Sequence, residues 1–276
     1  MTIPADSILI TGASSGIGAA LAEIYAKPGV ALWLSGRNAS RLAAIASTCS
    51  ACGASVSTRV LDVVERDTMA AWIADCDKTR PLDLVIANAG ITAGTGGVAK
   101  DGGIELPGQA QRIFAVNVDG VFNTVEPAIP LMRRHTQRRG VVAKAARGQI
   151  AIVSSLAGFR GFPGAPAYSA SKAAVKAWGE ALGPILAADG IHVSVVCPGF
   201  ITTPMTDRNA FPMPFLMPAD KAARRIQNGL ARGRARIAFP WPMYATAWLL
   251  GALPPALGNK ILTGSPGKAS FHDEAR

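Results

Sequence analysis

The chain has 276 residues, of which 49% are hydrophobic and 17% charged, and it carries a formal net charge of +10. A chain of this length can bury a large core, so one α/β domain over residues 1–276 is the economical organisation. The positive charge could attract anionic cofactors, membrane surfaces or nucleic acid. The sequence has no helix-turn-helix pattern, zinc-finger spacing or alternation of aromatic and basic residues, so we expect no nucleic-acid partner.

The first residues show no basic stretch followed by an apolar segment, so we expect no secretory signal and a cytoplasmic location. Four cysteines also suit a reduced compartment better than a disulfide framework. Cys49 and Cys52 have CxxC spacing, but a zinc site needs a second pair of ligands, and only Cys76, Cys197 and three scattered histidines remain. The CxxC pair also follows a predicted helix rather than a βα turn. We therefore predict structural cysteines and no metal site.

Short apolar runs alternate with longer helical segments along the chain. This alternation is typical of a doubly wound parallel sheet (Rossmann-type), here with about seven strands and helices on both faces. Most of the runs are nearly continuous in Ile, Val, Leu and Ala, as strands covered on both faces should be. In chain order, the predicted strands are Ser7–Thr11, Val30–Ser35, Val56–Leu61, Asp83–Ala87, Gln149–Ser154, His192–Cys197 and Arg236–Phe239. The predicted helices between them are Ile17–Lys27, Ser40–Cys49, Glu65–Asp77, Gln109–Arg134, Ala167–Ala188 and Pro218–Arg232.

A glycine-rich turn, Thr11–Gly18, leads from the first predicted strand into a helix. Glycines allow the backbone to turn sharply and to approach a pyrophosphate, and the helix N-terminus offers free N–H groups. The spacing is GxxxGxG rather than the GxGxxG of many dinucleotide sites, but the βαβ context favours the same use. The predicted binding residues of this turn are Gly12, Ser14, Ser15, Gly16, Ile17 and Gly18.

The end of the second predicted strand bears on the choice of cofactor. NAD-binding folds place an acidic residue there, against the ribose 2′-hydroxyl, whereas an arginine accepts the 2′-phosphate of NADP. This strand ends in Leu34-Ser35-Gly36-Arg37-Asn38, without a carboxylate. Arg37 can form charge-assisted hydrogen bonds to the phosphate. The sequence therefore favours NADP(H), with NAD(H) as the alternative, although an exposed loop arginine would look the same.

Tyr168 and Lys172 lie four residues apart, and Ser155 lies thirteen positions before the tyrosine. On a helix, residues four apart share a face, so the phenol and the ammonium point into the same space. A nearby cation lowers the pKa of a phenol, but a lowering by about three units corresponds to roughly 4 kcal/mol. We therefore expect a second positive charge, such as an oxidised nicotinamide, to assist one lysine. Taken alone, such a pair is more often a packed ring and a solvated amine. With Ser155, it suggests a proton-transfer site.

Taken in order, these motifs resemble those of the short-chain dehydrogenase/reductase family over residues 7–205. Besides the glycine-rich turn, the resemblance rests on Leu61-Asp62-Val63, Asn88-Ala89-Gly90, Asn117, Ser154–Gly158, the YxxxK motif Tyr168–Lys172 and Cys197–Thr203. The resemblance implies a catalytic group of Asn117, Ser155, Tyr168 and Lys172. It implies cofactor contacts at Asp62, Val63, Asn88, Ala89, Gly90, Tyr168, Lys172, Pro198, Gly199, Ile201 and Thr203.

The family resemblance also implies a mechanism. Hydride would pass between NADP(H) and a carbonyl or secondary-alcohol substrate, with Tyr168 as general acid or base and Ser155 on the same oxygen. Lys172 would lower the pKa of Tyr168 and bind the nicotinamide ribose, and Asn117 would hold a water that connects Lys172 to solvent. Ile201 and Thr203 would orient the carboxamide. For Asn117 and Thr203, the sequence alone favours structural roles, such as a helix kink or a cap.

Several alternatives stay open at this level. One is an NAD(H)-dependent alcohol dehydrogenase of the same family. Another is a membrane-peripheral reductase of lipid or sterol ketones, although a membrane surface is the less favoured partner. A third is a nucleotide-binding scaffold without turnover. The family also implies a homodimer or homotetramer.

Four segments depart from the family pattern or extend it. The basic stretch 133–147 is expected to be a solvated loop, with contact to an acidic partner or a membrane as the alternative. Pro184 interrupts the helix that carries Tyr168, which puts the usual dimer geometry in doubt. The expected substrate lid, 200–232, is apolar and proline-rich, which fits either a bulky apolar substrate or simple packing. The apolar extension 240–276 has too short an apolar run to span a bilayer, which takes ~20 residues, and we expect it to pack on the body or on another subunit.

Overall fold

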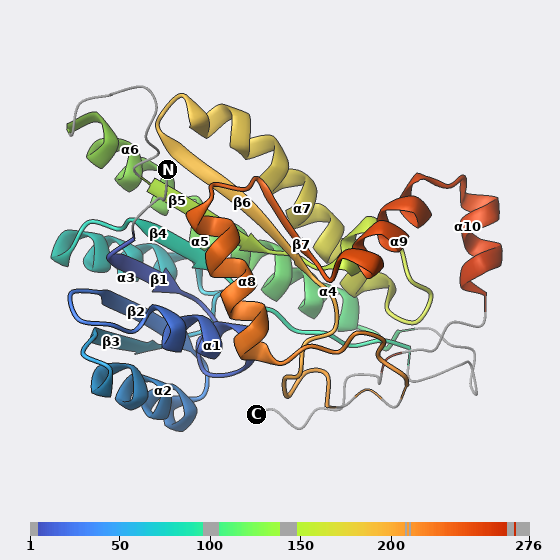
Figure 1. Ribbon diagram of the computed structural model, residues 1–276, viewed down its shortest axis with the longest axis horizontal. Coiled ribbons are helices and arrows are strands. Elements are labelled where there is room, and N and C mark those ends of the chain that lie inside the picture. Colours follow the sequence, from blue (N-terminus) through green and yellow to red (C-terminus); the bar gives the residue numbers. More distant parts are fainter. Residues whose placement is uncertain are drawn as a thin grey trace.

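Apolar strands form the centre of the molecule. The computed structural model describes residues 5–95, 105–138, 148–207, 209, 211–263 and 268. Within these residues, seven strands form one sheet in which every neighbouring pair is parallel, in the order β3-β2-β1-β4-β5-β6-β7 (Figure 1). They are β1 (Ser7–Ile10), β2 (Ala31–Gly36), β3 (Ser55–Val60), β4 (Leu84–Ala87), β5 (Gly148–Val153), β6 (Ile191–Pro198) and β7 (Arg236–Phe239). All seven predicted strands are confirmed to within about a residue at each end.

Helices cover both faces of this sheet. Successive side chains of a strand point to opposite faces, so Ile8 and Ile10 of β1 join one buried cluster and Leu9 joins another. The first cluster is completed by α1 (Gly16–Tyr25), α2 (Ala39–Ala51) and α8 (Ala219–Ala231). The second is completed by α3 (Arg66–Thr79), α5 (Gly120–Val125), α6 (Ala128–Arg138) and α7 (Pro166–Ala187). The predicted Rossmann-type fold is therefore confirmed.

The strand order reverses between β1 and β4, because chain connections run outward from this pair in opposite directions. In open α/β sheets, such a reversal leaves a crevice outside the carboxyl ends of the strands, and ligands bind there. The glycine-rich turn follows β1 directly, and Asn88 follows β4. The fold thus brings the motifs of the sequence to one edge of the sheet.

The expected single helix 109–134 is wrong in detail. The chain forms α4 (Gln109–Phe114), then a π-helical segment η1 (Ala115–Asp119), then α5 and α6. Helix α6 continues to Arg138, so the first part of the basic stretch is helical and not the loop that we expected. Arg133 within it pairs with Asp189 at 2.7 Å between Nε and Oδ2. Residues 139–147 of the stretch lie outside the described residues.

Helix α7 does not end at Pro184. It continues past the proline to Ala187, so the interruption falls in its last turn. A proline near a helix end removes one backbone hydrogen bond but leaves the preceding turns intact. Tyr168 and Lys172, near the beginning of α7, are therefore unaffected by it.

The carboxyl-terminal extension packs on the body with one face. Helix α9 (Trp241–Ala252) buries Ala247 against Leu156 and Val195, and it exposes 57% of Trp248 on its outer side. Helix α10 (Pro255–Leu262) follows it at the same end of the molecule (Figure 1). The expected packing on the body is thus confirmed for α9. In the part of the chain that the structure describes, no helix is both long and apolar enough to cross a membrane.

The predicted structural cysteines all remain free thiols. Cys49 is buried in α2, whereas Cys52, just after that helix, is exposed. Among the described residues, no cluster of three or more His, Cys, Asp or Glu could hold a metal ion.

Candidate active site

The turn after β1 requires glycine. Gly12 has φ +66°, and a Cβ there would lie 2.8 Å from the Cα of Ala89. The Asn88 amide fixes this turn, since its Nδ2 donates to the carbonyls of Thr11 at 2.9 Å and Gly12 at 3.2 Å. Asn88 is therefore a support for the turn as well as part of the cavity wall. The backbone is left bare where a pyrophosphate would approach it.

Helix α1 begins in this turn, at Gly16. Its cap, Ser15, makes no side-chain hydrogen bond to the helix, so the first N–H groups of α1 face the cavity with the positive end of the helix dipole. Gly16 has φ +58°, and a Cβ there would lie 2.9 Å from Cγ2 of Thr203. The predicted carboxamide segment therefore packs directly on the predicted phosphate turn.

Arg37 and Asp62 face each other at the far end of the cavity, after β2 and β3. Their Nη1 and Oδ2 atoms lie 3.6 Å apart, and the arginine side chain is 50% exposed. Sequence reasoning missed Arg41, which lines the same end from the first turn of α2. The sequence did indicate this position, because asparagine is a preferred helix cap and Asn38 precedes Arg41 by three residues. In the structure, Asn38 Oδ1 accepts the backbone N–H of Arg41 at 2.9 Å, which places Arg41 on the same side of the cavity as Arg37. Two arginines fit a phosphate here.

Helix α7 carries Tyr168 and Lys172 on its buried side. The Lys172 ammonium lies 5.9 Å from the centroid of the Tyr168 ring and donates to the carbonyl of Val153 at 2.9 Å. Burial is the main cause that lowers the pKa of Lys172 to about 8. Burial also raises the pKa of Tyr168, and a hydrogen bond with the Ser155 hydroxyl acts in the opposite direction. The protein alone thus leaves the phenol protonated, and ionisation needs further positive charge.

Ser155 follows β5 and caps the short 3-10 helix η2 (Leu156–Phe159). Its Oγ accepts the N–H of Ala157 at 3.1 Å and lies 3.5 Å from the carbonyl of Pro198. The neighbouring Ser154 is used differently, since its hydroxyl donates to the carbonyl of Lys172 at 2.7 Å. Of the two serines, Ser155 is therefore the one placed beside the phenol, as predicted.

Asn117 lies in the π-helical segment η1 and is fully buried. Its Oδ1 accepts the N–H of Ile91 at 2.8 Å, and its Nδ2 donates to the carbonyl of Ile91 and to Ser171 Oγ, both at 3.0 Å. A Cβ on Gly90 would lie 3.2 Å from Asn117 Oδ1 and 3.3 Å from Lys172 Nζ. The Asn117 side chain thus fixes the loop after β4 against α7, immediately beside the lysine. Single π turns of this kind are frequent at functional sites.

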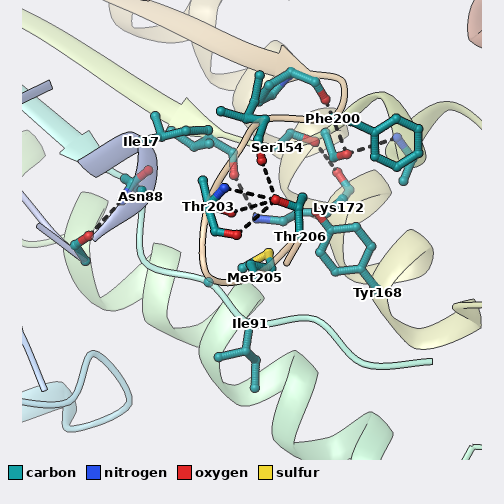
Figure 2. A pocket seen from close by; sticks show the side chains of 18 of the residues that line it. Ile17, Asn88, Ile91, Ser154, Tyr168, Lys172, Phe200, Thr203, Met205 and Thr206 are labelled. Atoms are coloured by element: carbon teal, nitrogen blue, oxygen red, sulfur yellow. Dashed lines mark hydrogen bonds between the residues drawn. The ribbon is translucent and has the colours of Figure 1, made fainter. Parts of the chain in front are cut away.

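Thr206 organises the segment after β6, and the sequence did not single it out. Its hydroxyl donates to the carbonyl of Ile201 at 2.7 Å and accepts the N–H of Thr203 at 2.9 Å. Figure 2 shows Thr203 and Thr206 side by side at the wall of the pocket, where their hydroxyl oxygens lie 3.4 Å apart. The expected carboxamide contacts at Ile201 and Thr203 would therefore have to share these groups with Thr206.

One cavity of about 1300 Å³ connects these parts. It is lined by every predicted site residue except Gly18 and Asn117, which lie behind its wall. In Figure 2, Asn88 lies on one side of this space and the Tyr168 ring on the other. Much of the remaining lining is apolar, with Phe162, Met205, Phe211, Phe215, Met243 and Leu250. Two cations, Arg112 and Lys268, also line the cavity and were not predicted.

Comparison with known proteins identifies the family of the chain. A family profile described as short chain dehydrogenase matches residues 6–211. An uncharacterized oxidoreductase of Myxococcus xanthus is 38% identical over 248 residues, covering 89% of this chain and 92% of its own. A 3beta-hydroxysteroid dehydrogenase of Mediterraneibacter gnavus is 35% identical over 204 residues, covering 74% of this chain and 68% of its own.

Solved structures show the same fold. A short-chain dehydrogenase from Sphingobium yanoikuyae in complex with NADPH has a TM-score of 0.74 and 25% identity, covering 97% of this chain and 98% of its own. A short chain dehydrogenase/reductase from Burkholderia phymatum in complex with NAD has a TM-score of 0.78 and 24% identity, covering 99% of both chains. The family match over residues 6–211, with these relatives, shows that the chain belongs to the short-chain dehydrogenase/reductase family and is an oxidoreductase of that family.

Proposed function

We propose that the protein interconverts an apolar ketone and the corresponding secondary alcohol with NADP(H), using Tyr168 as general acid or base. One observation carries this proposal. The hydroxyl of Ser155, the phenol of Tyr168 and the ammonium of Lys172 meet in the cavity that the glycine-rich turn also lines. When bound, the cofactor would supply or accept the hydride, and the protein would handle the proton.

Tyr168 would transfer the proton to or from the substrate oxygen. In reduction, the phenol donates it to the carbonyl oxygen while hydride adds to the carbonyl carbon, which yields the alcohol and a phenolate. In oxidation, the phenolate takes the hydroxyl proton as hydride leaves the same carbon. Ser155 is placed to donate a hydrogen bond to the oxygen on which charge develops. Lys172, which is 4% exposed, keeps a positive charge beside the phenolate and favours it.

The preference for NADP(H) rests on Arg37 and Arg41, which line the end of the cavity after β2. Guanidinium groups bind phosphate through charge-assisted hydrogen bonds, whereas the 2′-hydroxyl of NAD(H) calls for a carboxylate. Asp62 is close, at 3.6 Å from Arg37, but it follows β3 and not β2. The solved relatives carry NADPH in one case and NAD in the other, so the arginines of this chain are the supporting evidence.

The proposal of an apolar substrate is supported by the apolar side chains that line the cavity. Phe211 packs edge-to-face on Phe200 at 6.0 Å between ring centroids, and both line the cavity. Met243 and Leu250 extend this surface from α9. Part of the proposed lid thus contacts the space itself instead of only packing on the body. A relative named for a hydroxysteroid substrate is consistent with a pocket of this kind.

The decisive experiment measures oxidation of NADPH with a panel of apolar ketones, in the wild type and in Tyr168→Phe. We expect turnover in the wild type and a loss of at least about a hundredfold in the variant, with unchanged NADPH affinity. Tyr25→Phe is the matched control, because it removes a buried phenol that does not line the cavity. No turnover with any ketone, together with tight NADPH binding, would support a scaffold instead of an enzyme.

We also propose self-association, as a homodimer or homotetramer. Ile185 near the end of α7 is 60% exposed, and α9 and α10 expose further large apolar side chains. Light scattering of the purified protein gives its mass directly, and a monomer would remove this part of the proposal.

A further inference from the structure

Lys268 lies in the cavity, although its position in the sequence gives no hint of this. Its backbone N–H donates to the carbonyl of Gly164 at 3.1 Å. Its ammonium donates to the hydroxyl of Thr92 at 3.0 Å and lies over the Tyr168 ring, 4.2 Å from the ring centroid. One backbone contact and two side-chain contacts therefore hold this residue beside the proposed catalytic phenol.

We propose that Lys268 binds an anionic group of the substrate, a carboxylate close to the reacting carbonyl, as in a 3-oxo or 3-hydroxy acid with an apolar tail. This inference names the substrate class for the proposed function and rests on it. The tail would lie along the apolar wall, and the reacting oxygen would lie between Ser155 and Tyr168.

The charge of Lys268 itself favours an anionic ligand. Within the described residues, no carboxylate lies at ion-pair distance from its ammonium, and its partners are a neutral hydroxyl and an aromatic face. An ammonium has three N–H donors, and the Thr92 hydroxyl accepts one of them. Removing such a cation from water without a counter-ion is costly, and burial lowers the pKa of Lys268 to about 8. A carboxylate in the cavity would restore the balance.

The charged groups around Lys268 also favour an anionic ligand. Lys172 lies 5.9 Å from the centroid of the Tyr168 ring, and the charge of Lys268 contributes to the lowered pKa of Lys172. The carboxylate of Glu105 accepts the N–H of Ala167 at 3.1 Å, at the beginning of α7. Among the described residues, the two lysines therefore place positive charge beside the Tyr168 ring, which favours an anion.

The position of Lys268 relative to Tyr168 favours a carboxylate near the reacting carbonyl. The Lys268 ammonium lies over the ring of Tyr168 itself, so an anion bound to it would lie in the same part of the cavity as the carbonyl that Tyr168 protonates. Gly94 makes room for this lysine, because a Cβ there would lie 2.6 Å from Cβ of Lys268. A carboxylate far along a chain would not reach both groups. The acid group should therefore lie within a few bonds of the reacting carbon, as in a 3-oxo or 3-hydroxy acid.

The test compares 3-hydroxydecanoate with its methyl ester, which has the same tail but no charge. In the dead-end complex with NADPH, calorimetry should show the acid binding at least about tenfold more tightly than the ester. Lys268→Met should remove this difference, and Lys268→Arg should keep most of it. Lys260→Met, an exposed lysine of α10, is the matched control and should change neither affinity.

Turnover with NADP⁺ separates the two proposals. Lys268-dependent binding of the acid without any oxidation would support the anion site and would contradict the proposed function. Oxidation of acid and ester with equal kcat/KM, reduced equally by Lys268→Met, would keep the function and overturn the anion site. In that case the lysine would act on Tyr168 or hold the chain in place, not on the substrate.

Discussion

The charge at the end of β2 provides the sharpest test of cofactor choice. We predict that Arg37→Asp lowers the affinity for NADPH much more than the affinity for NADH. Arg37 lines the cavity and lies 3.6 Å from Asp62, so it is held by one carboxylate and is free to bind a phosphate with its remaining donors. An aspartate would remove those donors and place a second carboxylate beside Asp62.

The expected loss of NADPH affinity follows from the exposure of the Arg37 side chain. A hydrogen bond to a charged group contributes about 1.5–3 kcal/mol when it is well buried. The Arg37 side chain is 50% exposed, so solvent screening places it near the lower limit, which corresponds to roughly tenfold in the dissociation constant. Repulsion between the new aspartate and the phosphate adds a similar factor, so we expect about 30- to 100-fold weaker NADPH binding. The NADH affinity should change by less than about threefold, because its ribose hydroxyl has no charge.

The assay is a fluorescence titration with NADPH and NADH at low and high salt. The loss for NADPH should shrink at high salt, because exposed charges are screened. Arg59→Asp is the control, since it makes the same charge change on the exposed strand β3 outside the cavity. Equal losses of NADPH and NADH affinity in Arg37→Asp would refute the role of Arg37 in reading the phosphate.

Three further predictions concern the supports of the site. Gly12→Ala should lower the free energy of unfolding by about 2 kcal/mol or more, because it combines a positive φ with contact to Ala89; urea unfolding measures this. Asn117→Ala should cost about 2–3 kcal/mol and also reduce kcat, since both polar groups of Ile91 lose their partner; a loss of stability alone would contradict its positioning role. Burial lowers the pKa of Lys172 from 10.5 to about 8, so the unfolded chain binds more protons between these values. The contribution of Lys172 to stability should therefore rise from about pH 8 to 10, so the wild type should gain stability relative to Lys172→Met over this range, as urea unfolding of both at each pH would show.

The sheet could be predicted, and so could the proximity of Tyr168, Lys172 and Ser155, because both depend on local sequence. A buried parallel strand is a short run of apolar residues, and each run in the sequence became a strand. Tyr168 and Lys172 share a helix face whatever the tertiary structure, since four residues make about one turn of a helix. Ser155 then follows from its place at the end of a strand. The helices that cover the sheet follow from the same alternation.

What the sequence did not predict depends on contacts between distant parts of the chain. Lys268 meets Thr92, which lies 176 positions earlier, and no local pattern indicates such a pair. The π-helical segment at Asn117 was also missed, because a helix with one extra residue in a turn has nearly the same periodicity as a regular helix. Arg41 is different, since its helix cap was visible in the sequence and could have placed it beside Arg37.

The four residues after β4 connect the glycine-rich turn to Lys172, the proposed catalytic lysine. Asn88 binds the carbonyls of the glycine-rich turn, and three positions later Ile91 binds both polar groups of Asn117. Between them, Gly90 leaves the space in which Lys172 Nζ lies, 3.3 Å from where its Cβ would be. A shift of this short segment would therefore move the phosphate turn and the lysine at the same time. In the proposed function, the relative position of cofactor and phenol would thus depend on this loop, and substrate choice would depend on the proposed lid, α9 and Lys268, which line the cavity from elsewhere.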